Sequence, residues 1–134
     1  MKLVHSDFDK ITGKTSVTIA DRYGKYTGIA KLHPEDKNNY IVGGTIAETR
    51  AMIKVCKSRL SREKIRLQTL ISFKNEFSLS PEDTILLNKK IKLYQKNIEG
   101  FKVSIEYRET FLKHYLKERT EISETIKKMM DKKE

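Results

Sequence analysis

The amino-acid sequence predicts an α+β fold, in which a small N-terminal antiparallel β-meander precedes a long antiparallel helical hairpin that resembles a coiled coil. Three observations support this prediction: alternating segments divided by glycine turns over residues 1–32, a heptad spacing of apolar residues in two later segments, and a short polar break between those segments. The chain of 134 residues has the size of a single domain. It divides into the meander and its loop (1–44), a first helix (45–78) and a second, longer helix (80–132).

Three short strands are predicted at residues 1–9, 16–22 and 26–32. Two turn-like triplets, Thr12-Gly13-Lys14 and Tyr23-Gly24-Lys25, separate them. Connections this short join neighbouring antiparallel strands, so the strands form a meander. A three-stranded sheet of this size needs a cover on one face, and in this chain only the helices can supply it.

The first helix is expected to begin at Thr45. The segment 33–40 is a polar loop interrupted by Pro34, and Ile41-Val42 are expected to return briefly to the sheet. Gly43-Gly44 then precede a capping box, in which the side chains of Thr45 and Glu48 each satisfy a free backbone N–H of the other residue.

Apolar residues recur at heptad spacing through the first helix, which ends near Phe77. Glu63 is the one clear mismatch in this seam, and the single cysteine, Cys56, occupies a seam position as a small core residue. Ser80 and Pro81 provide an N-cap and a first helical residue for the second helix. The short link between the helices predicts an antiparallel hairpin.

The second helix carries thirteen seam positions spaced four and three residues apart, of which eleven are apolar. They are Leu87, Ile91, Tyr94, Ile98, Phe101, Ile105, Arg108, Leu112, Tyr115, Arg119, Ile122, Ile126 and Met129. Because the seam keeps its phase across Gly100, we expect one continuous helix.

The two helices differ in length, and the longer one is expected to overhang the shorter by roughly 17 residues. That overhang carries Tyr115, Ile122, Ile126 and Met129 on its apolar stripe. Unless the sheet covers all of this stripe, a second protomer must, so the sequence predicts a homo-oligomer, a dimer or higher.

The composition favours an anionic partner and gives no sign of an enzyme. The chain has 28 Lys and Arg residues against 18 Asp and Glu, a formal charge of +10. It has no P-loop, GxSxG or HExxH motif, and its three histidines lack metal-ligand spacing, so we expect no catalytic site, metal or cofactor. The loop segment His33-Pro34-Glu35-Asp36 is interpreted as a solvated turn. No apolar run reaches the ~20 residues that cross a bilayer, and the start does not resemble a signal peptide, which predicts a cytosolic protein.

Two groups of residues are candidates for binding. The first is a basic belt, formed where the two helices lie side by side and able to neutralise phosphates, with a solvated helix face as the alternative interpretation. Its members are Lys54, Lys57, Arg59, Arg62, Lys92 and Lys96.

The second candidate is a pocket between protomers that combines arginines with aromatic rings. Arginine binds phosphate with its planar fork, and a base can stack on an aromatic ring. The residues are Tyr107, Arg108, Phe111, Tyr115 and Arg119, and Arg50, in the first turns after Gly43-Gly44, could join an anion held at that helix N-terminus. Arg108 and Arg119 occupy seam positions, so the alternative is a salt bridge that sets the register, with Glu48 or a carboxylate of a partner.

Two segments, Thr27–Asp36 and Gly43–Ala51, resemble a pattern in small proteins of Gram-positive phages and prophages, a G-x-A-x-x-H-P-E-D turn followed by a G-x-x-I-A-x-x-R-A helix start. The layout of a small sheet and two long helices is also similar to anti-Thoeris proteins, phage-encoded oligomers that sequester cyclic-ADP-ribose-type immune signals. This resemblance implies a nucleotide sponge without catalytic activity, with ligand pockets between protomers, in the host bacterial cytosol.

The sequence therefore favours a phage counter-defence protein that sequesters an anionic nucleotide immune signal. Two other classes stay open. One is an inhibitor of a host nucleic-acid machine that acts by protein contact, of the anti-CRISPR or host-takeover type, and the other is a basic nucleic-acid-binding accessory protein.

Overall fold

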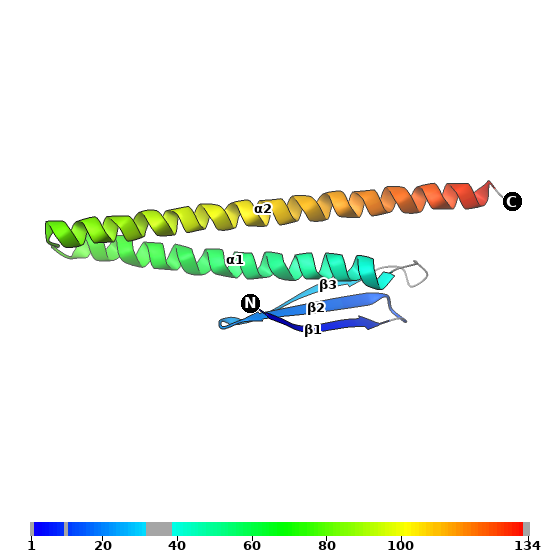
Figure 1. The fold of residues 1–134 in the computed structure, drawn as a ribbon, viewed down its shortest axis with the longest axis horizontal. Helices are drawn as coiled ribbons and strands as arrows, with labels where there is room; N and C mark the ends of the chain where they lie inside the picture. The colour runs from blue at the N-terminus through cyan, green and yellow to red at the C-terminus, as the bar shows by residue number, and fades with distance from the viewer. Residues whose placement is uncertain (1, 10, 32–38, 133–134) are drawn as a thin grey trace.

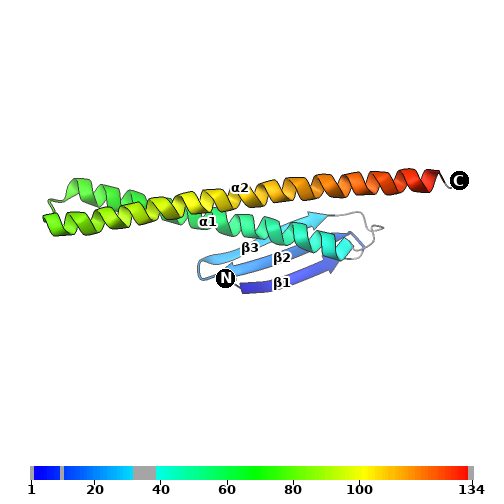
Figure 2. The same cartoon turned by 45° about the horizontal axis from the view of Figure 1, so that its top comes forward.

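A computed structural model describes residues 2–9, 11–31 and 39–132 of the chain (Figure 1). It confirms the predicted α+β class, a three-stranded antiparallel meander followed by two long helices that pack against each other. The elements are β1 (Lys2–Asp9), β2 (Lys14–Asp21), β3 (Gly24–Lys31), α1 (Asn39–Glu76) and α2 (Pro81–Asp131). They form three layers, with α1 lying between the sheet and α2 (Figures 1 and 2).

The sheet has the order β1-β2-β3, and its first turn is tighter than expected because β2 begins at Lys14. Lys14 pairs with Asp9, and the N–H of Gly13 donates to the carbonyl of Asp9 at 2.8 Å. Gly13 has a φ of 72°, in the left-handed region that favours glycine. The Asp9 carboxylate accepts from the N–H of Ile11 at 2.9 Å, which stabilises the turn.

Helix α1 covers the inner face of β2 and β3, and this contact forms the core. Val17 and Ile19 of β2 and Ala30 of β3 are buried against the helix residues Val42, Ile46, Ala47, Ala51 and Val55. Strand β1 is less well covered, since Leu3 and Val4 are 60% and 46% exposed.

The predicted start of the first helix at Thr45 is wrong, because α1 already begins at Asn39. Ile41 and Val42 are helical and do not return to the sheet. Val42 is buried in the core, and this burial outweighs the cost of two glycines inside a helix, about 1 kcal/mol each relative to alanine. The Thr45 hydroxyl donates to the carbonyl of Ile41 at 3.1 Å, as a helix-interior threonine does, so it is not an N-cap.

The extra turns of α1 cover more of α2 than predicted. Tyr115 was expected on the overhang, yet it packs against the core together with Leu112 and Leu116. The apolar stripe becomes exposed only beyond Arg119, where Ile122 and Met129 are 38% and 58% exposed. The structure therefore has the predicted overhang of α2, but this overhang is shorter than the sequence predicted.

The heptad seam itself is confirmed. Every predicted seam position of α2 from Leu87 to Arg119 is buried or half-buried, and α2 runs through Gly100 without a break. Ser80 caps α2 by accepting the N–H of Asp83 at 3.2 Å. Cys56 is buried, as expected of a core residue, and its Sγ atom lies 3.7 Å from the hydroxyl of Ser104.

The polar mismatch in the seam, Glu63, is buried with partners on both helices. Its carboxylate accepts from Arg66 at 2.7 Å and from Asn97 of α2 at 3.4 Å. A buried carboxylate with hydrogen-bond partners is tolerated, whereas an unpaired one is costly. Glu63 thus fixes the register of the two helices at their middle.

Candidate functional site

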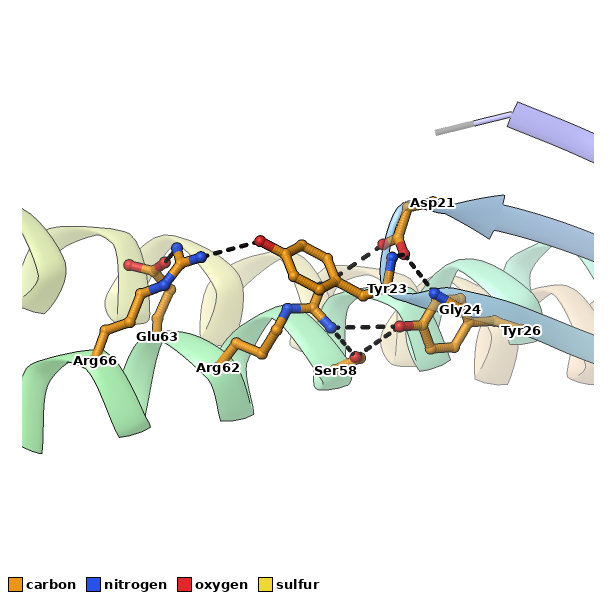
Figure 3. Close-up of polar contacts among 8 residues, drawn as sticks. All are labelled: Asp21, Tyr23, Gly24, Tyr26, Ser58, Arg62, Glu63 and Arg66. Atoms are coloured by element: carbon orange, nitrogen blue, oxygen red, sulfur yellow. Dashed lines mark hydrogen bonds and ion pairs between the residues drawn. The ribbon is translucent and has the colours of Figure 1, made fainter. Parts of the chain in front are cut away.

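The β2–β3 turn packs against the middle of α1, and the two border an open cationic pocket of about 310 Å³. We call it the arginine–tyrosine pocket. Its lining residues are Asp21, Arg22, Tyr23, Arg59, Arg62, Glu63, Arg66 and Phe101. They come from the turn, from one face of α1 and from the seam of α2, and Figure 3 shows the polar contacts among most of them.

Asp21, at the end of β2, holds the turn in place. Its Oδ1 atom accepts the N–H of Tyr23 at 2.8 Å and that of Gly24 at 3.2 Å, which is the usual way in which an aspartate stabilises a turn. Its Oδ2 atom is buried and has no hydrogen-bond partner among the described residues. That atom lies 3.7 Å from the guanidinium of Arg62, so the carboxylate depends on this arginine for its compensation.

Arg62 joins the sheet to α1 (Figure 3). Its Nη1 atom donates to the Ser58 hydroxyl at 2.6 Å and to the Tyr26 hydroxyl at 3.4 Å. The hydroxyls of Ser58 and Tyr26 are themselves 2.7 Å apart. Hydrogen bonds from Ser58 and Arg62 lower the pKa of Tyr26. The Arg62 guanidinium also lies 3.8 Å from the centre of the Tyr23 ring, a cation–π contact.

Tyr23 lies between arginines. Its hydroxyl accepts from Arg66 at 3.1 Å, and the Arg22 guanidinium is 5.0 Å from its ring centre. Burial raises the pKa of Tyr23, but the hydrogen bonds and positive charges of Arg22 and Arg66 outweigh this and lower the pKa overall. Glu63 raises the pKa of Arg66 through the 2.7 Å ion pair between them.

The charges of the pocket do not balance. Four arginines face two carboxylates, and each carboxylate is engaged by one arginine, Asp21 by Arg62 and Glu63 by Arg66. Arg22 and Arg59 have no carboxylate partner within the described part of the chain. Two guanidinium groups therefore face the same small cavity with unmatched positive charge, beside the rings of Tyr23 and Phe101.

The lowered pKa of Tyr23 gives a testable result. We expect the phenols of Tyr23 and Tyr26 to ionise below the usual value of about 10 in an ultraviolet titration, and Tyr23→Phe to remove one of these early transitions. Since the folded-state pKa lies below the unfolded one, ionisation of Tyr23 favours the folded state above its lowered pKa, and this contribution is lost as the pH falls through it. An unchanged titration curve in Tyr23→Phe would contradict the described contacts with Arg22 and Arg66.

The structure divides the predicted basic belt among four places. Arg59 and Arg62 line the arginine–tyrosine pocket. Lys54 donates to the carbonyl of Thr27, and Lys57 forms an ion pair with Glu109 at 3.4 Å. The remaining two, Lys92 and Lys96, are exposed on α2.

Arg50 lies at the outer edge of the sheet and about three turns into α1, not at a helix N-terminus where it could join a bound anion, because α1 begins at Asn39. It donates to the carbonyl of Ile29 at 2.6 Å, and Lys54 contacts the carbonyl of Thr27 in the same way. Both carbonyls belong to β3, an edge strand of the sheet. Cationic side chains in this position block the pairing of a foreign strand, so these two residues protect the edge.

The other predicted pocket residues lie along α2. The rings of Phe111 and Tyr115 stack with centres 5.7 Å apart, and Tyr107 is 71% exposed. Arg108 donates to the Ser104 hydroxyl at 2.6 Å and forms no salt bridge within the described residues. Arg119 is half-buried at its seam position.

Six residues of the arginine–tyrosine pocket were not among the predicted site residues: Asp21, Arg22, Tyr23, Glu63, Arg66 and Phe101. One signal was present, because Arg59, Arg62 and Arg66 are spaced by three and four residues and so share one helix face. The position of the β2–β3 turn against that face depends on tertiary packing, which no local pattern reveals.

The described part of the chain contains no group of three or more His, Cys, Asp or Glu side chains arranged to hold a metal ion. Nor does it contain a helix long and apolar enough to cross a membrane. The segment His33–Asp36 lies outside the described residues. Comparison with protein families, with curated proteins and with solved structures finds no match.

Proposed function

We propose that this protein binds an anionic nucleotide in the arginine–tyrosine pocket and sequesters it without converting it. One observation carries the proposal: Arg22 and Arg59 line the pocket without a carboxylate partner among the described residues, beside the rings of Tyr23 and Phe101. Guanidinium groups bind phosphate oxygens in a fork, and an aromatic ring gives a base a surface on which to stack.

The arginines and carboxylates of the pocket are suited to holding a ligand and not to proton transfer. A guanidinium stays protonated at neutral pH and so donates hydrogen bonds without acting as a base. The carboxylates of Asp21 and Glu63 are engaged by backbone N–H groups or by arginine. In this proposal the ligand leaves the pocket unchanged.

The biological role that fits this chemistry is phage counter-defence, in which the protein removes a nucleotide immune signal from the host cytosol. A cyclic nucleotide that carries phosphates and adenine would use both parts of the pocket, the guanidinium groups and the rings. Tight retention is sufficient for such a role, because an immune effector responds only to free signal.

The proposal is tested by thermal unfolding of the full chain with inorganic phosphate, ADP, a cyclic dinucleotide and a cyclic ADP-ribose isomer, each in excess. We expect at least one nucleotide to raise the Tm by several degrees and to be recovered intact after denaturation. Arg59→Ala should weaken the binding of that nucleotide by about tenfold, which corresponds to the loss of one charge-assisted hydrogen bond. Lys64→Ala, an exposed neighbour on α1 outside the pocket, is the matched control and should not change the affinity. If no probe shifts the Tm, the proposal fails.

Nucleic-acid binding is a second candidate, favoured by a run of lysines on α2. Lys89, Lys90, Lys92 and Lys96 are all exposed, with no acidic residue between them. Binding of this kind would weaken steeply with salt, because each neutralised phosphate releases a counterion. A steep salt dependence with duplex or single-stranded DNA, together with no effect of nucleotides, would favour this function over sequestration.

A protein-contact inhibitor is a third candidate, favoured by apolar side chains at the closed end of the hairpin. Phe73 and Phe77 pack with ring centres 4.6 Å apart, and both are exposed, as is Leu86. Exposed apolar patches often mark protein contacts. Specific co-purification of a host protein, lost on Phe77→Asp, would favour this function.

A further inference from the structure

Helix α2 presents a long apolar stripe to solvent. Successive members of this stripe are 7, 14, 4, 11 and 7 residues apart in the sequence, and each spacing is close to a whole number of helical turns. On a straight helix their side chains therefore point within about 60° of one another. They are Leu86, Leu93, Tyr107, Phe111, Ile122 and Met129, and their exposed fractions lie between 38% and 71%. We call them the outer stripe. It covers roughly 65 Å of the helix, which Figures 1 and 2 show as one unbroken rod.

The outer stripe complements itself when two copies run in opposite directions. A register that places Leu86 of one copy against Met129 of a second copy also places Leu93 against Ile122. The same register brings Tyr107 close to Tyr107 of the second copy, at a two-fold axis. We propose that the protein is a symmetric dimer in which α2 packs antiparallel against α2 of a second copy along the outer stripe.

Gly100 lies on the exposed face of α2 that this register brings against the second copy. Gly100 costs α2 about 1 kcal/mol relative to alanine. No packing inside the protomer explains it, since a Cβ there would meet nothing within 4 Å. In the antiparallel register Gly100 lies within about one helical turn of Phe111 of the second copy, and Phe111 is 41% exposed. An exposed ring thus comes near a position that has no side chain, which allows the two helices to pack closely.

The charges of α2 favour the antiparallel direction. Its first half carries Lys89, Lys90, Lys92 and Lys96, and the segment 118–124 of its second half carries Glu118, Glu121 and Glu124, all exposed, between Lys117 and the pair Lys127 and Lys128. Antiparallel packing places each lysine block beside the glutamate block of the other copy, with Lys96 next to Glu118. Parallel packing would bring lysines against lysines, which is unfavourable.

The dimer would also cover the overhang of α2, because the closed end of the second hairpin lies against Ile122 and Met129 in this register. The proposed dimer is independent of the proposed nucleotide function, since the arginine–tyrosine pocket lies within one protomer. Tyr107, Arg108 and Phe111 would lie beside the two-fold axis.

The first test measures the mass of the full chain in solution by light scattering over a range of concentrations. We expect a dimer, and we expect Leu93→Glu to raise its Kd by tenfold or more. Lys96→Glu and Glu118→Lys should each weaken the dimer several-fold, and the double variant should restore the wild-type Kd to within about twofold. Lys113→Glu, exposed on the opposite face of α2, is the matched control and should have no effect. A monomeric wild type, or a dimer that survives Leu93→Glu, would overturn the proposal.

A second test determines the direction of packing by cysteine cross-linking, to which buried Cys56 is not accessible. Under mild oxidation, the cysteine of the Tyr107→Cys variant should form a disulfide with the same cysteine of the second copy. Leu93→Cys should cross-link only when mixed with Ile122→Cys. Cross-linking of Leu93→Cys to itself would show a parallel dimer and would overturn the antiparallel register. Circular dichroism of each variant shows whether its helices are intact, so that loss of the dimer is not confused with unfolding.

Discussion

Gly28→Ala should lower the free energy of unfolding by about 3 kcal/mol, among the largest effects of any single methyl group in this protein. A Cβ at Gly28 would lie 1.9 Å from the carbonyl oxygen of Ala47 and 2.5 Å from the backbone nitrogen of Ala51. Both atoms belong to the backbone of α1, so no side-chain rotation relieves the clash. The helix would have to move away from the sheet and open the core. Urea unfolding followed by circular dichroism measures the change.

The matched control for this prediction is Gly44→Ala. Gly44 also lies in α1, but a Cβ there meets nothing within 4 Å. Alanine is the better helix former, so this variant should be as stable as the wild type or up to about 1 kcal/mol more stable. Equal stability of Gly28→Ala and Gly44→Ala would contradict the close approach of α1 to β3.

Arg62→Ala should lower both stability and nucleotide binding. The variant removes the ion pair of Asp21, whose carboxylate is 8% exposed, together with the contacts to Ser58 and the Tyr23 ring. Removing one partner of a buried ion pair costs about 3 kcal/mol, and we reduce this to about 2 kcal/mol because Arg62 is 23% exposed. The affinity for a nucleotide that binds the wild type should fall by tenfold or more, since the Tyr23 ring loses its support.

A second substitution separates the two effects. Adding Asp21→Asn to Arg62→Ala removes the uncompensated charge, so part of the lost stability should return. Nucleotide binding should stay weak, because the guanidinium is still absent. Calorimetric titration and urea unfolding of both variants measure this. If Arg62→Ala alone leaves stability and affinity unchanged, Arg62 does not have the structural role assigned to it.

The sequence alone predicted the architecture, because that architecture depends on regular repeats. The seam of α2 from Leu87 to Arg119 follows a strict four-three spacing, and the structure buries or half-buries every position of it. The N-cap at Ser80 and the continuity through Gly100 were also predicted correctly. The start of α1 was not, because burial of Val42 against the sheet overrides the local signal of two glycines.

The candidate site was harder to predict, because its residues are far apart in sequence. The sequence suggested the chemistry, arginines beside aromatic rings, but placed it on α2. The structure brings Tyr23 of the β2–β3 turn against Arg62 and Arg66 of α1, a contact between segments about forty residues apart. Helix periodicity gives the face on which those arginines lie, but it does not reveal which turn of the sheet will cover them.

The binding claim is tested most directly by an NMR titration that follows the Nε–H signals of the arginine side chains while ADP and then cyclic di-AMP are added. Binding in the arginine–tyrosine pocket predicts that the signals of Arg22, Arg59, Arg62 and Arg66 shift together and saturate, while those of Arg50 and Arg119 stay in place. Shifts confined to Arg108 and Arg119 would instead move the site to α2. No shift of any arginine with either nucleotide would contradict the binding function altogether.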